Sequence, residues 1–178
     1  MKTTPQKRHS KRSGQSGTST QPGSKTALKQ LNSLEFDDLQ TRHPDIRPEL
    51  LPRPAYKDKT ANELTKSIIN WIRLNGGQSE RISVTGRMID RRKLFTDCLG
   101  HYREIGSTQW IKSSMQRGSA DVSAIIKKKS VKIEIKVGKD KQRPDQVNYQ
   151  RSVEAAGGIY FIATSFEQFY TWYKKAFE

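Results

Sequence analysis

The chain is poor in several features that define large classes of protein. It has one cysteine, Cys98, in 178 residues, which excludes an intramolecular disulfide framework and a zinc site built from cysteines alone. No run approaches the ~18 apolar residues that a membrane-spanning helix needs. No apolar segment of ~7–15 residues follows the basic start, as a secretory signal requires. We therefore expect a protein of a reducing compartment, the cytoplasm, without membrane association.

Acidic residues are also scarce. Asp and Glu number 18 against 33 Lys and Arg, so the formal net charge is +15. Residues 1–30 hold seven of these basic residues and no acidic residue, yet the remainder of the chain is basic as well. A basic tail on a basic domain predicts a polyanionic partner, most simply nucleic acid. The alternative is a charge that only aids solubility.

Aliphatic residues are nearly absent from the N-terminal part. Leu28 is the first Leu, Ile, Val, Phe, Trp or Tyr, and six of the seven prolines lie before residue 55. Because such a segment buries too little apolar surface to offset the entropy of ordering, we expect residues 1–58 to be a disordered basic and Pro-rich tail and linker. The folded domain is then expected over residues 59–178.

Periodic apolar patterns begin near residue 60. Thr60 and Glu63 form a capping box before an amphipathic helix that ends at the glycines 76 and 77. Residues 91–107 show no clear pattern. The other elements are strands within 79–90, 121–127, 131–137 and 159–163, and helices after Pro144 and Ser165. This order predicts an α/β layer fold with a mixed sheet.

One strand alternates strictly between apolar and charged side chains. Residues 131–137 read Val-Lys-Ile-Glu-Ile-Lys-Val, so Glu134 and Lys136 share the face opposite the aliphatic residues. If Lys128-Lys129 is a two-residue turn, Asp121 lies opposite Lys136 and points to the same face as Glu134. A slip of one residue in this register would separate the two carboxylates.

Two carboxylates beside a lysine suit chemistry on a phosphodiester. Oxygen ligands from Asp121 and Glu134 would hold Mg²⁺ or Mn²⁺, which neutralises charge on the phosphate and activates a bound water. Lys136 would orient that water or offset charge in the transition state. The alternative is a cross-strand salt-bridge cluster on an exposed sheet face, worth about 0–1 kcal/mol per pair.

The order of these motifs resembles a known nuclease family. Gly118-Ser119-Ala120-Asp121, Ile133-Glu134-Ile135-Lys136, Gln146 and Gly157-Gly158 are similar to the VRR-NUC domain, the virus-type replication-repair branch of the PD-(D/E)xK phosphodiesterase superfamily. The similarity runs from about residue 63 to 172 and is greatest to small phage-encoded members. It implies a restriction-endonuclease-like core, with a mixed β-sheet flanked by α-helices. Ala120 stands where the superfamily name has proline.

The resemblance also implies roles for individual residues. The metal and catalytic site would comprise Asp121 and Glu134 as ligands, Ile135 through its carbonyl, and Lys136 as the catalytic lysine. Gln146 and Glu63 match family positions near the site. Each has a local alternative, because Glu63 is also the capping partner of Thr60 and Gln146 is a polar residue in a first helical turn.

Basic residues around these motifs are candidates for contact with the phosphate backbone. They are Lys128, Lys129, Lys139, Lys141, Arg143, Arg81 and Arg87. For the lysines at 127–129, a solvated hairpin tip is the alternative. The histidines and Cys98 show no paired spacing for zinc.

Together these features predict a divalent-metal-dependent endodeoxyribonuclease that acts on DNA in replication, repair or recombination, in a bacterial or phage-infected cell. Structure-selective cutting is an inference by analogy at the level of the fold. A homodimer would suit a branched two-fold substrate. The alternative is a non-catalytic nucleic-acid-binding adaptor. Sequence-specific restriction ranks below both, because nothing resembles a base-reading domain.

Overall fold

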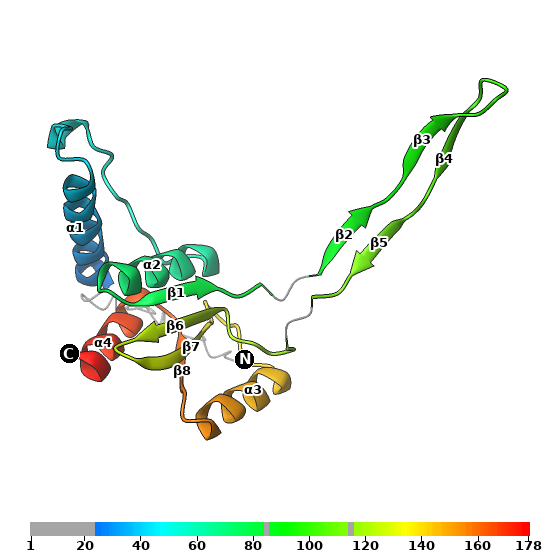
Figure 1. The fold of residues 1–178 in the computed structure, drawn as a ribbon. Helices are drawn as coiled ribbons and strands as arrows, with labels where there is room; N and C mark the ends of the chain where they lie inside the picture. Colours follow the sequence, from blue (N-terminus) through cyan, green and yellow to red (C-terminus); the bar gives the residue numbers. More distant parts are fainter. Residues whose placement is uncertain (1–23, 84–85, 114–115) are drawn as a thin grey trace, which may run out of the picture.

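The protein consists of a compact body and a long two-stranded arm that projects from it (Figure 1). The computed structural model describes residues 24–83, 86–113 and 116–178. Residues 86–113 form the arm, and the remaining described residues form the body. None of the described helices is long and apolar enough to cross a membrane.

A four-stranded mixed sheet forms the centre of the body. Its order is β1-β6-β7-β8, with bounds Gln78–Arg81, Val122–Ile126, Lys129–Ile135 and Ile159–Ala163. The first three strands pair antiparallel, whereas β7 and β8 are parallel and joined through helix α3 (Pro144–Ala155). The predicted α/β fold class with a mixed sheet flanked by helices is confirmed.

The core lies between one face of this sheet and helices α2 (Ala61–Leu74) and α4 (Phe166–Phe177). Apolar residues of β6 and β7 alternate onto that face, and Val131 and Ile133 are fully buried there. Both predicted caps are present: the Oγ1 of Thr60 accepts the Glu63 N–H, and Ser165 accepts the Gln168 N–H. Helix α3 contacts β8, and its Gln146 reaches Glu134 on the sheet face turned away from the core.

Residues 24–58 differ from the predicted disordered tail. Ser24–Arg42 form helix α1, and a short 3-10 helix follows at Pro48–Leu50. Ala27 and Leu31 are buried in the core, where α1 packs on α2 and α4. The sequence does not predict this helix because its few apolar residues stand among polar ones and form a narrow apolar stripe. Residues 1–23 of the predicted tail lie outside the described residues.

The arm is a two-stranded β-ribbon made of two successive ladders. Strand β2 (Arg87–Asp90) pairs with β5 (Thr108–Ile111), and β3 (Lys93–Thr96) pairs with β4 (Tyr102–Ile105). Arg87 lies opposite Ile111 and Lys93 opposite Ile105, so the two ladders share one register. The segment 91–107, for which the sequence shows no pattern, therefore forms most of a hairpin. The sequence predicts one strand, or two interrupted at Gly86, within residues 79–90, and the structure has two, β1 in the body and β2 in the arm.

The turn between β6 and β7 is one residue earlier than predicted. It consists of Lys127 and Lys128, which both have positive φ angles of 44° and 69°, as a two-residue type I′ turn requires. Val122 therefore lies opposite Ile133 as the last pair of the ladder, and Asp121 directly precedes β6 at the end where Glu134 follows Ile133. Moving the turn by one residue along the chain changes the residue opposite each β6 position by two. Because side chains alternate with a period of two, both carboxylates stay on the same face of the sheet.

Candidate metal and nucleic-acid site

Three predicted site residues meet at one end of the sheet, on the face turned away from the core. The Nζ of Lys136 lies 3.1 Å from the Oε1 of Glu134. The Oδ2 of Asp121 accepts the N–H of Ile135 at 2.8 Å. Glu134 is 1% and Lys136 6% exposed. The salt-bridge alternative expects an exposed sheet face, whereas this ion pair is buried.

The carboxylate of Glu134 is held by two further side chains. The Nε2 of Gln146 donates to Oε1, and the Oη of Tyr160 donates to Oε2 at 3.4 Å. The Oε1 of Gln146 also accepts the N–H of Arg143 at 2.9 Å. Gln146 thus combines both of its predicted roles, since it closes the first turn of α3 and touches the site.

Burial and charge shift the protonation of this cluster. Burial, followed by the negative charge of Asp121, raises the pKa of Glu134. Burial lowers the pKa of Lys136, but its contacts with Asp140 and Glu134 outweigh that effect and leave the pKa raised. Lys136 lies 3.1 Å from Asp140. The site therefore joins a cationic lysine to two mutually repelling carboxylates, an arrangement that a bound cation would stabilise.

A cavity of ≈ 260 Å³ opens at this cluster. Asp121, Glu134, Ile135 and Lys136 line it, together with Arg81, Arg143 and the first turns of α2 and α3. From α2 the lining residues are Ala61 and Thr65. Glu63 instead accepts the Thr60 N–H at 3.1 Å, so the structure has its capping interaction. The predicted site role of Glu63 stays a prediction.

The donor set determines which metal fits. In the described ranges 24–83, 86–113 and 116–178, no group of three or more His, Cys, Asp or Glu side chains is placed to hold a metal ion. Two carboxylates and a backbone carbonyl at Asp121, Glu134 and Ile135 are hard oxygen donors. Mg²⁺ and Mn²⁺ take such donors and keep several waters or substrate oxygens. The residues therefore fit one of these ions, completed by solvent or phosphate.

The residues predicted to contact the phosphate backbone lie in different parts of the structure. Arg81 and Arg143 line the cavity, and Lys139 and Lys141 lie exposed on the loop that follows Lys136.

Lys128 and Lys129 are not brought to the site. They lie at the other end of β7, about 16–20 Å away at 3.3 Å per residue. The Nζ of Lys129 lies 5.8 Å from the Phe177 ring centroid. These two lysines therefore fit the alternative of a solvated hairpin tip near the C-terminal helix.

Arg87 belongs to a charged face of the arm that the sequence did not reveal. Four cations share this face by their register: Arg87, Arg91, Lys93 and Arg103. Asp97 at the tip binds Arg103 at 2.6 Å, and among the described residues no acidic side chain pairs with the other three. On the opposite face, Arg92 bridges Asp90 and Glu104. Charge is thus segregated across the ribbon.

Sequence reasoning missed Asp140 and Tyr160. Asp140 stands in the run Lys139-Asp140-Lys141, where nothing distinguishes it from a solvated charge. Tyr160 pairs with Lys132 in the parallel ladder, and only knowledge of that register places it on the face of Glu134. Burial, followed by the charge of Glu134, raises the pKa of Tyr160.

The sequence matches no protein-family model and no curated protein with which it was compared. The resemblance to VRR-NUC domains therefore stays a prediction.

Proposed function

We propose that this protein is a divalent-metal-dependent nuclease that hydrolyses phosphodiester bonds in DNA. The observation that carries the proposal is the convergence of Asp121, Glu134 and Lys136 in one cavity, where Asp121 directly precedes β6 and Glu134 lies in β7. Buried ionisable groups with shifted pKa values that gather in a cavity are typical of a chemical site rather than of a structural ion pair.

Each side chain has a distinct role in this proposal. Asp121 and Glu134 hold the ion, and Gln146 and Tyr160 fix the Glu134 carboxylate in position. When bound, Mg²⁺ or Mn²⁺ supplies charge neutralisation at the phosphate and lowers the pKa of a water. Lys136 stays protonated between Glu134 and Asp140. Its ammonium is placed to donate hydrogen bonds to the attacking water or to a phosphate oxygen.

Basic residues beside the cavity favour a nucleic-acid substrate. Arg81 and Arg143 line the same cavity as the carboxylates, and the arm carries further cations at Arg87, Arg91 and Lys93. Phosphate contacts of this kind supply most non-specific affinity for DNA and make it sensitive to salt. A VRR-NUC-like assignment is consistent with these features and is part of the proposal.

A cleavage panel tests the proposal. Labelled linear, single-stranded, flapped and four-way DNA are incubated with Mg²⁺, Mn²⁺ or a chelator. We expect metal-dependent cleavage that falls by at least about 10²-fold in Asp121→Asn and Lys136→Ala. Asn retains an oxygen that accepts the Ile135 N–H but lacks the charge. Asp37→Asn, an exposed acid on α1, is the matched control and should cleave like wild type.

Binding measurements separate this proposal from the adaptor alternative. Titration calorimetry with Mn²⁺ should give one binding event that Asp121→Asn abolishes while circular dichroism remains native. A protein that binds DNA, takes up no Mn²⁺ and cuts none of the substrates would be the non-catalytic adaptor instead.

A further inference from the structure

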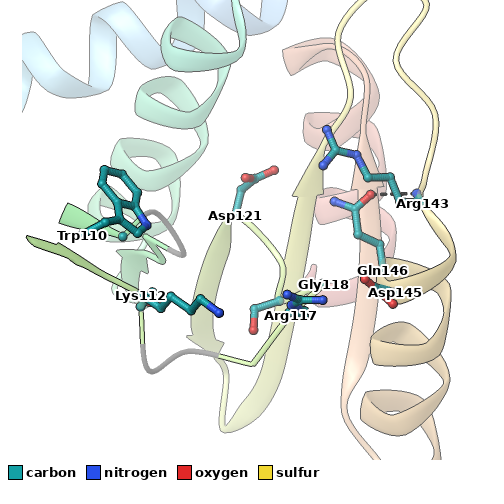
Figure 2. Close-up of a pocket in the computed structure, with 11 residues that line it drawn as sticks. Trp110, Lys112, Arg117, Gly118, Asp121, Arg143, Asp145 and Gln146 are labelled. Carbon is teal, nitrogen blue, oxygen red and sulfur yellow. Dashed lines mark hydrogen bonds between the residues drawn. The ribbon is translucent and has the colours of Figure 1, made fainter. Parts of the chain in front are cut away.

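A second, larger cavity adjoins the candidate metal site. It has a volume of ≈ 500 Å³ and shares Asp121, Gln146 and Arg143 with the smaller cavity. One wall is the base of the arm, which contributes Trp110 and Lys112, and Arg143 and Gln146 lie across the opening from it (Figure 2). Arg117 and Gly118 form the floor between them. A molecule in this cavity would lie directly beside the metal ligands.

Trp110 presents an aromatic surface to this cavity. Its side chain is 55% exposed, and among the described residues no other aromatic ring packs against it. One part of the indole rests on the backbone of Gly86, where an added Cβ would lie 2.8 Å from its Cε2 and Nε1 atoms. The glycine thus allows the ring to lie close to the neighbouring strand. An exposed indole held in this way is a platform on which a flat group can stack.

Three cations line the same cavity as this aromatic surface. Lys112, Arg117 and Arg143 line the same cavity, and all three are exposed. An exposed aromatic ring among cations is the combination that binds single-stranded nucleic acid, because bases stack on the ring while phosphates contact the cations. The volume lies within the range of ≈ 300–1,000 Å³ that is usual for small-ligand sites.

The close approach of two loops fixes this cavity beside the metal site. Gly118 has a φ of +78°, and an added Cβ would lie 2.3 Å from the carbonyl oxygen of Asp145. The backbone at Gly118, three residues before Asp121, therefore rests directly on the first turn of α3, which carries Gln146. Gly118, which lines the cavity, is thus held against Gln146 beside the candidate metal site.

We infer that this cavity receives an unpaired base of the substrate strand, stacked on Trp110, next to the phosphodiester that is cut. A paired base keeps its faces inside the duplex, so only an unpaired or extruded base reaches an indole in a pocket. This inference rests on the proposed function and specifies its substrate as nucleic acid with an unpaired nucleotide beside the scissile bond, such as a single strand, flap or branch point.

The test measures binding rather than cleavage. Oligonucleotides with 2-aminopurine at one position, as a single strand, in a flap junction and in a fully paired duplex, are titrated with the full chain in chelator. Stacking on Trp110 should quench the fluorescence of the unpaired probe. Trp110→Ala should weaken binding of the single strand and the flap by roughly 5- to 100-fold and remove the quenching, with less than about a twofold effect on the duplex.

Two variants serve as matched controls. Trp110→Phe keeps a stacking surface and should retain most of the affinity. Tyr102→Ala removes another exposed aromatic side chain of the arm, 86% exposed and close to the tip, and should bind like wild type. Free deoxyadenosine monophosphate should compete far more weakly than the oligonucleotide, since the cations then contact one phosphate instead of several.

Equal single-strand affinity in Trp110→Ala and Tyr102→Ala would overturn the inference, and so would an equal loss on duplex and single strand, or tighter binding of the free nucleotide. Metal-dependent cleavage by wild type would still stand in that event. Absence of cleavage with intact quenching would instead overturn the proposed function and leave a single-strand-binding pocket.

Discussion

The body and the arm are both built from β-ladders, but different forces hold them. In the body, strands β6 and β7 bury one face against helices, and Val122, Val131 and Ile133 are 0% exposed. In the arm, large apolar side chains stay in solvent, with Leu94 77% and Met88 65% exposed. Burial fixes the register of the body, whereas the arm relies on backbone hydrogen bonds and surface ion pairs.

This contrast separates the arm from the body in stability. A two-stranded ribbon without a buried face is marginally stable in water, and surface ion pairs such as Arg92–Asp90 add little. An arm of this length with apolar and basic residues in solvent is therefore suited to a partner. The charge segregation across the ribbon favours a polyanion, in line with the proposed substrate.

Replacing one tryptophan in the body and one in the arm should give the largest difference in the free energy of unfolding between the two regions. Trp71 is 2% exposed and makes edge contacts with Phe166, Tyr170 and Tyr173. Trp71→Ala should lower the free energy of unfolding by about 3–5 kcal/mol, because it leaves a cavity in the core. Trp110→Ala in the arm should change it by no more than about 0.5 kcal/mol. Urea titrations followed by circular dichroism measure both.

Trp71→Phe is the control for this pair of variants and should lower the free energy of unfolding by less than Trp71→Ala. Similar losses for Trp71→Ala and Trp110→Ala would mean that the arm shares the cooperative core of the body.

A smaller effect is expected at the turn between β6 and β7. Lys127 and Lys128 hold positive φ angles that cost an L-residue with a Cβ roughly 1–2 kcal/mol each. Replacing them by Asn-Gly should therefore stabilise the protein by about 1 kcal/mol, measured by urea unfolding. The same dipeptide at Lys128-Lys129 should destabilise it, because Lys129 pairs with Ile126 in the ladder. Stabilisation by the second replacement would contradict the register.

The response of two carboxylates to pH should show the smallest effect. Burial raises the pKa of Glu134 above its ordinary value of 4.5, whereas hydrogen bonds from Arg92 lower the pKa of Asp90 in the arm to about 2. In carboxyl NMR titrations under chelator, Glu134 should take up its proton first on acidification, and Asp90 should remain ionised to about pH 2.

The pKa shifts of Glu134 and Asp90 change the free energy of unfolding with pH in opposite directions. The raised pKa of Glu134 favours folding below its unfolded pKa, and this contribution is lost as pH rises through the folded pKa. The unfolding free energy of Glu134→Gln, relative to wild type, should therefore increase as pH rises above about 4.5. Asp90 instead contributes above its unfolded pKa and loses that contribution as pH falls toward 2. A pH-independent difference for Glu134→Gln would contradict the raised pKa.

Much of the body was predictable because its signals are local. The Thr60 and Ser165 caps, the alternation over 131–137 and the helix after Pro144 each follow from a few neighbouring residues. The shared face of Asp121 and Glu134 was also predictable, although the turn was placed one residue too late. Three consecutive lysines contain no Asn or Gly that would mark the positive-φ positions.

The missed features depend on contacts between distant segments. Helix α1 is ordered by packing of Ala27 and Leu31 on α2 and α4, which its own sequence does not signal. The arm lacks the clean alternation of a half-buried strand because neither face is buried. Trp110 and Arg117 reach the candidate site only through the return of the arm to the sheet, which no spacing rule describes.

The single register of the arm has a consequence for its length. Since Arg87–Ile111 and Lys93–Ile105 keep the same register in two successive ladders, deleting two residues from each strand within one ladder would preserve which side chains face outward and shorten the reach by about 6–7 Å. Beyond the base of the arm, its strands pair only with each other. Such deletions would therefore leave the proposed metal ligands unchanged. The length of the arm and the residues of the proposed metal site can therefore be changed independently of each other.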